Sequence, residues 1–175
     1  MAFDLKLRSM EKFLPELHVL FQAIIALLLG GLLGWEREAA GKWAGLRTQM
    51  LVCLATMLFV RLGQILIGDS AADVSPAAVR ADPVHIIAAV ATGISFLGAG
   101  TIFHDRCGKS RGLTTAAGLL VTASIGIAVA MDRYVIACGV TLLCFFVLHT
   151  LRRLEAAAVG AKSNSTQEIL SPRAQ

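Results

Sequence analysis

Two short stretches between apolar segments carry charged side chains whose types and spacing suit chemistry. One stretch reads GWEREAAGKWAGLR and the other HDRCGKSR. From them comes the candidate functional cluster of this chain: Glu36, Arg37, Glu38, Arg47, Asp105 and Arg111. Such acids and bases suit a small-ligand site, a partner-docking face or ion pairs at helix ends, of which ion pairs are the commonest.

Motifs of enzymatic chemistry do not accompany this cluster. Gly108, Lys109 and Ser110 form the GKS of a phosphate-binding loop, but Phe103 stands where that motif requires glycine. The sequence has no HExxH or CxxC, and its histidines are scattered. Mg²⁺ prefers oxygen ligands, and no carboxylate lies deep in an apolar segment. We therefore expect neither an enzyme nor a resident metal or cofactor.

The composition indicates a membrane protein. Hydrophobic residues make up 56% of the chain and charged residues 16%, and the mean hydropathy is +0.70. A water-soluble domain of this length needs more polar surface. The net charge of +4 fits cytoplasmic loops in a bilayer better than nucleic acid, because no Lys/Arg run or aromatic platform is present.

Five apolar segments are long enough to cross a hydrocarbon core of about 30 Å at about 1.5 Å per helical residue. The fold class expected is all-α, a polytopic membrane protein with spans at about 17–35, 46–68, 84–103, 113–131 and 134–151. Residues 1–16 suit a short helix in the headgroup region, which Pro15 breaks before the first span. A frayed terminus is expected equally. Residues 152–175 form a polar tail, expected to be mostly disordered.

Polar residues interrupt the first two spans. His18 and Gln22 lie in the first and Arg61 in the second. We favour a snorkelling Arg61 over a buried functional one, because it lies within about two turns of the end of its span. His18, at a span end, is more typical of an interfacial ring than of a ligand.

Small residues repeat at helical spacing and predict close helix packing. The third span presents Ala88, Thr92, Ser95 and Ala99, and the fourth presents a similar stripe. We expect the two stripes to dock against each other, with hydroxyl groups available to bond across. GxxxG in the first span favours packing within one bundle over a dimer contact. The candidate packing residues are Gly30, Gly34, Gly98, Gly100, Gly118, Thr122 and Gly126.

An odd number of spans places the two termini on opposite sides. Most of the 16 Lys and Arg fall in the loops after spans one and three and in the tail, which favours that side as cytoplasmic. The N terminus is then periplasmic and the C terminus cytoplasmic. Both charged stretches must approach the same face, where the acids of one can meet the bases of the other.

Five ordered motifs resemble the signature of the MgtC/SapB family of bacterial inner-membrane proteins. They are GWERE at 34–38, AGLRT at 44–48, FLGAGTIF at 96–103, RGLTTAA at 111–117 and VTASIG at 121–126. The resemblance runs from about Ile24 to Ala137. It implies a five-span domain in the bacterial inner membrane and an association with magnesium homeostasis. In pathogens it further implies survival in host phagocytes and modulation of ATP synthase or other membrane partners.

The chain departs from that family in two places. Family members often carry a C-terminal domain like an ACT regulatory fold, whereas a short tail is expected here. Many have Arg, Gln and Gly where this chain has His85, Ala89 and Ser95.

The matches favour a non-enzymatic regulator that acts on a membrane partner. A small oligomeric transporter or channel is the alternative, and a purely structural bundle is the third hypothesis.

Overall fold

The computed structural model describes residues 2–70, 83–104 and 110–150. Its helices are α1 (Ala2–Ala39), α2 (Leu46–Ser70), α3 (Pro83–Ala99), α4 (Leu113–Ala130) and a fifth helix, Tyr134–Thr150. Strands β1 (Phe103–His104) and β2 (Ser110–Arg111) pair antiparallel. By length and composition, α1, α2 and α4 contain stretches able to cross a membrane, and α3 and the fifth helix are shorter and apolar. The expected all-α membrane protein is confirmed.

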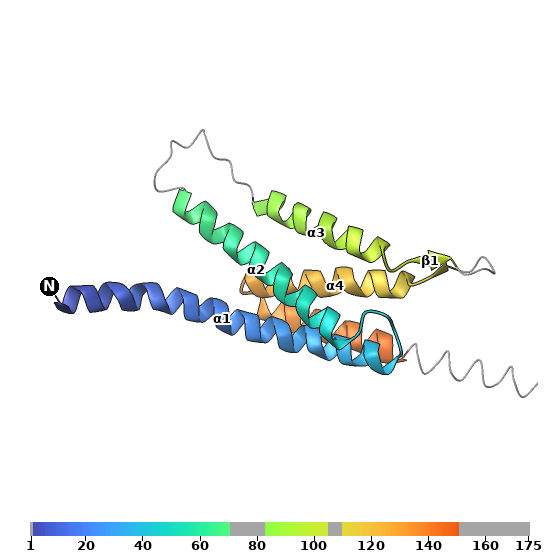
Figure 1. The fold of residues 1–175 in the computed structure, drawn as a ribbon. Helices are drawn as coiled ribbons and strands as arrows, with labels where there is room; N and C mark the ends of the chain where they lie inside the picture. The colour runs from blue at the N-terminus through green and yellow to red at the C-terminus, as the bar shows by residue number, and fades with distance from the viewer. Residues whose placement is uncertain (1, 71–82, 105–109, 151–175) are drawn as a thin grey trace, which may run out of the picture.

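The helices run side by side as a bundle, as Figure 1 shows. The C-terminal ends of α1 and α3 and the start of α4 lie at the right-hand end of that view, and the N terminus lies at the opposite end. At the opposite end, α1 and α2 extend past the turn that joins α4 to the fifth helix. This difference in length gives the bundle two dissimilar ends.

Four of the helices build the core, and α3 lies at its edge. The main cluster of buried apolar side chains comes from α1, α2, α4 and the fifth helix, as illustrated by Leu33, Met57, Ile125 and Ala137. From α3 only partly buried side chains such as Ile86 pack against it. An apolar groove of about 460 Å³ separates α3 from α2. Most of α3 is therefore exposed.

Two helix boundaries differ from the expectation. Pro15 lies inside α1, which continues through it to Ala39. Proline removes one backbone hydrogen bond, and Pro15 is exposed, so the helix loses only a bond at its surface. The third span was expected to reach Phe103, but α3 ends at Ala99 and Phe103 belongs to β1.

The predicted docking of the α3 stripe on the α4 stripe is wrong. The α3 stripe of Ala88, Thr92, Ser95 and Ala99 is exposed, and its hydroxyls donate to backbone carbonyls one turn earlier in the same helix. The α4 stripe is buried, but against α2. A Cβ on Gly126 would collide with Thr56 Oγ1 and Cys53 O. The reason is that α4 packs on both α2 and α3 and turns its small face toward α2.

The other candidate packing glycines differ in their surroundings. A Cβ on Gly30 would lie 2.8 Å from Cys53 Cβ, and one on Gly34 would lie 2.6 Å from Leu46 Cα, so both face α2 of the same chain. Gly98 lies beside Ala116 of α4 at an ordinary 3.5 Å.

Two further candidates, Gly118 and Gly100, have more open surroundings. Gly118 is buried near Gln49, at 3.8 Å. Gly100 was expected to pack between helices, but it is exposed beyond the end of α3 and its Cβ would meet only carbonyls of the preceding turn.

Candidate functional site

The two charged stretches lie at one end of the bundle. Trp43, in the loop between α1 and α2, packs on Phe103 of β1 with ring centroids 5.2 Å apart. Gly112, before α4, has a φ of 91° and so close an approach to Thr101 that a Cβ would collide with its carbonyl oxygen. Glycine adopts this left-handed conformation without steric cost. These contacts hold the α1–α2 loop and the β1–β2 hairpin together.

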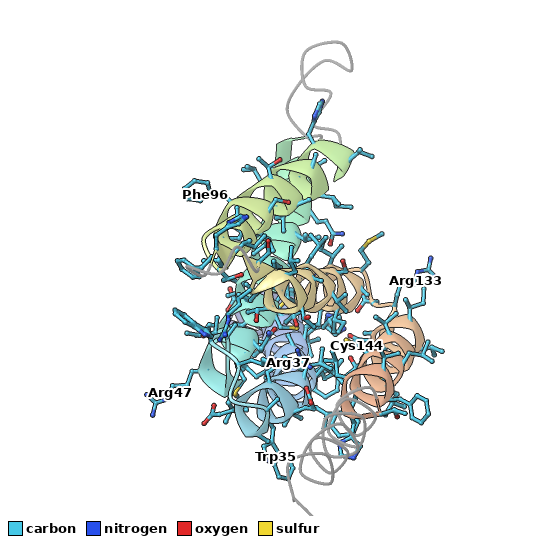
Figure 2. The ribbon with its side chains drawn as sticks, turned by 90° about the vertical axis from the view of Figure 1, so that its right-hand side faces the viewer. Trp35, Arg37, Arg47, Phe96, Arg133 and Cys144 are labelled. Atoms are coloured by element: carbon cyan, nitrogen blue, oxygen red, sulfur yellow. The ribbon has the colours of Figure 1, made fainter. Side chains whose placement is uncertain are left out.

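Glu36 and Arg37 form a buried ion pair in the last turns of α1. Their exposed fractions are 5% and 3%, and Arg37 Nε donates to Glu36 Oε2 at 2.8 Å. Figure 2 shows Arg37 among the helices, with Cys144 of the fifth helix nearby. Within the described part of the chain, Glu36 Oε1 and Arg37 Nη1 have no hydrogen-bond partner. The pair therefore holds one unused acceptor and one unused donor away from water.

Glu38 has a structural contact of its own. Its Oε2 accepts a hydrogen bond from the backbone N–H of Leu46, the first residue of α2, at 2.8 Å. The first N–H groups of a helix lack partners within it, and a carboxylate there also interacts favourably with the helix dipole. Gly45 passes close to the same carboxylate, since a Cβ there would lie 2.9 Å from it. Glu38 thus ties the end of α1 to the start of α2.

The remaining members of the candidate cluster do not join the buried pair. Arg47 is exposed and points away from Arg37 in Figure 2. Arg111 is exposed in β2. Asp105 lies outside the described residues. Among the described members of the candidate cluster, Glu36 and Arg37 thus form a buried pair, Glu38 caps α2, and Arg47 and Arg111 are exposed.

A second polar cluster, which the sequence analysis did not assign, lies at the opposite end. Gln22 of α1 is fully buried, and its Nε2 donates to Val129 O at 3.0 Å and to Asp132 Oδ1 at 2.9 Å. Asp132 occupies the turn after α4 with a φ of 59°. Aspartate is one of the few non-glycine residues that tolerates this conformation. These bonds join α1 to a turn more than a hundred residues away.

Asp132 receives further contacts. Tyr134 Oη donates to Asp132 Oδ1 at 2.9 Å, and His18 Nε2 lies 3.4 Å from the same oxygen. Snorkelling of Arg61 stays a prediction: the residue is half-buried, and its Nη1 donates to Gln64 Oε1, one turn nearer the end of α2, at 3.3 Å. In the part of the chain that is described, Gln22 Oε1 and Arg61 Nε are buried without partners.

One signal in the sequence pointed to this second cluster. Polar residues within a membrane span are costly and serve a function or find partners, and Gln22 and His18 are the polar residues of the first apolar segment. Nothing in the sequence alone paired them with Asp132, because Asp132 lies more than a hundred residues later in the chain.

Comparison with known proteins gives consistent family matches. Over 102 residues the chain is 40% identical to "Protein MgtC" of Brucella abortus, covering 58% of this chain and 38% of that protein. It is 35% identical over 135 residues to the "Putative magnesium transporter YhiD" of Escherichia coli, covering 77% and 61%. The chain thus spans less than half the length of the Brucella relative and under two thirds of the E. coli one.

A third relative matches along most of its length. "Protein SrpB" of Synechococcus elongatus is 37% identical over 163 residues, covering 83% of each chain. No solved structure matches. The family model described as "MgtC family" matches residues 23–157, which include the buried Glu36–Arg37 pair. The chain belongs to the MgtC family.

Proposed function

We propose that this chain is a non-enzymatic regulator of magnesium or membrane-energy homeostasis that acts on another protein of the bacterial inner membrane. Family membership and the name of the E. coli relative support the link to magnesium. The observation that carries the regulatory part is the buried Glu36–Arg37 pair with its unused acceptor and donor.

A buried ion pair of this kind suits a switch. Desolvation makes each charge dependent on the other and on any further hydrogen bond. A polar group of a partner that reaches Glu36 Oε1 or Arg37 Nη1 would stabilise one position of the α1 end relative to α2 and the fifth helix. A change in hydrogen bonding at one buried pair then alters the surface around it.

The proposed orientation places this end in the cytoplasm, with the N terminus periplasmic. Alkaline phosphatase fused within residues 69–83 should be active, and the same reporter fused at residue 175 should be inactive. The reverse pattern would contradict the orientation but not the buried pair.

Growth at low Mg²⁺ tests the regulatory function. In a strain that needs this protein for such growth, the double variant Glu36→Gln/Arg37→Gln should insert normally and fail to support growth. It removes both charges together, so neither is left buried alone. Arg47→Ala and Arg111→Ala, at exposed positions, should weaken growth if the partner contacts this end. Arg133→Ala, exposed at the other end, is the matched control.

Membrane content of each variant must be measured by immunoblot. Full growth with the double variant, at normal protein level, would rule out a role for the buried pair. Capture of one membrane protein by the native chain in mild detergent, lost in the double variant, would identify the partner.

A small transporter is the second candidate, favoured by the printed name of the E. coli relative. Vesicles containing only the purified chain decide between the two. Uptake of Mg²⁺ by such vesicles would establish transport, whereas vesicles that stay tight under a Mg²⁺ gradient would exclude it.

A further inference from the structure

Aromatic and basic side chains form an exposed surface around the Trp43–Phe103 contact. Trp43 is 81% exposed and Phe103 49%, although their rings pack on each other. Lys42 precedes Trp43, and Arg47 is the second residue of α2; both are exposed. We define these four residues and the exposed Arg111 as the aromatic–basic surface.

The register of the hairpin links the two halves of this surface. Phe103 pairs with Arg111 across β1 and β2. Arg111 is separated from Leu113, the first residue of α4, by Gly112 alone. Phe103, the Trp43 ring packed on it and Arg111 therefore lie level with the start of α4.

The length of α4 fixes the depth of that level in a bilayer. The helix has 18 residues, and at about 1.5 Å per residue it is about 27 Å long. A hydrocarbon core is about 30 Å thick. An apolar helix of this length that crosses the hydrocarbon core has both of its ends close to the headgroups. The aromatic–basic surface is level with the start of α4 and therefore lies at headgroup depth.

Charge at this surface is mainly positive. Lys42, Arg47 and Arg111 are exposed there. Of the described residues in the α1–α2 loop and its flanking turns, Glu38 is the exposed acid, and one of its oxygens is used by the N–H of Leu46. Aromatic rings favour the interface, and clustered Lys and Arg attract anionic headgroups.

From these observations we propose that the aromatic–basic surface binds the headgroups of anionic phospholipids in preference to zwitterionic ones. Trp43 and Phe103 anchor the α1–α2 loop and the hairpin at the interface, and Lys42 and Arg47 select the negative charge. The site is distinct from the buried Glu36–Arg37 pair. It does not rest on the regulatory function, and its test measures lipid contact rather than growth.

Tryptophan fluorescence tests the proposal, because the chain has 2 Trp. Trp35→Phe leaves Trp43 as the only tryptophan. The purified variant is placed in phosphatidylcholine vesicles that contain a minor fraction of brominated phosphatidylglycerol or the same fraction of brominated phosphatidylcholine. Bromine quenches only tryptophan in contact with it. Stronger quenching by the phosphatidylglycerol lipid is expected, and salt should reduce the difference because exposed charges are screened.

Charge removal should abolish this preference. Each basic side chain near a surface changes enrichment of an anionic lipid on the order of fivefold, so Lys42→Gln/Arg47→Gln should bring quenching by the two lipids close to equality. Arg133→Gln at the opposite end is the matched control and should keep the preference. Each variant is checked for native helix content by circular dichroism.

Four outcomes would overturn the proposal. Equal quenching by the two brominated lipids in the starting variant would mean that the surface does not select headgroup charge. A preference that survives in Lys42→Gln/Arg47→Gln would place the selectivity elsewhere. Protection of Trp43 from quenching by both lipids would put it away from the interface. Protection of Trp43 that appears only when a membrane protein with an acidic segment is added would assign the surface to that partner.

Discussion

Two regions of α1 bury polar groups in different ways. Near its C-terminal end, Glu36 and Arg37 are neighbours in the sequence and neutralise each other within one helix. In the middle of α1, Gln22 carries no charge and binds Asp132, a carboxylate whose side chain remains 47% exposed. The Glu36–Arg37 ion pair joins no separate elements, because both residues belong to α1. The Gln22–Asp132 hydrogen bond connects α1 directly to the turn after α4.

This difference indicates a division of roles. A fully buried charge pair contributes little net stability, because desolvation offsets its attraction, yet loss of one member is costly. A neutral amide that binds a partly exposed carboxylate avoids most of that desolvation and can fasten distant elements. We infer that the Gln22–Asp132 end holds the bundle together and that the Glu36–Arg37 end is the one suited to change.

The largest effect should come from leaving one buried charge alone. Glu36→Ala should lower the free energy of unfolding by about 3–5 kcal/mol, because Arg37 would stay buried without its carboxylate. Glu36→Gln/Arg37→Gln should recover most of this loss. Denaturation in mixed micelles, followed by circular dichroism, measures both. If the double variant is as unstable as the single one, the pair does more for the fold than we infer.

Close packing near the Gln22 end should give the next largest effect. Gly126→Ala should cost about 1–3 kcal/mol, because the new methyl group would collide with Thr56 and with the backbone of Cys53 on α2. Gly93→Ala in α3 is the matched control, since nothing lies within 4 Å of its added Cβ. The control should be neutral or slightly stabilising. Equal losses in the two variants would contradict the assignment of the α4 stripe to α2.

Gln22→Met tests the connection itself. The substitution keeps side-chain length and removes both hydrogen bonds, to Val129 O and Asp132, and we expect a loss of roughly 1–2 kcal/mol. Cross-linking or hydrogen exchange should show the turn after α4 opening before the core. A turn that stays as protected as in the native chain would mean that Gln22 is not what fastens it.

The smallest effect is expected from Tyr134→Phe. It removes one donor to Asp132 Oδ1 at an exposed position, where Gln22 still binds the same oxygen. A loss below about 1 kcal/mol is expected, measured in the same micelles. A loss as large as that of Gln22→Met would show that the contacts to Asp132 act as one unit.

Much of the fold was predictable from the sequence because hydropathy is a local property. The segments at 46–68, 113–131 and 134–151 agree closely with α2, α4 and the fifth helix. Two predicted helix boundaries were wrong because they rested on local sequence alone. Pro15 does not end α1, and α3 ends early, with residues 103–104 paired to 110–111 instead. Alternation of helix direction also placed both charged stretches at one end, as found.

The sequence by itself therefore determined the helices, their apolar character and the end of the bundle at which the charged residues gather. Only the tertiary structure decided that Glu36 and Arg37 are buried while Arg47 is exposed, that the small residues of α4 face α2, and that Gln22 binds Asp132. The physical reason is that burial and hydrogen bonding depend on neighbours contributed by distant segments, whereas helix formation in a membrane depends on the segment alone.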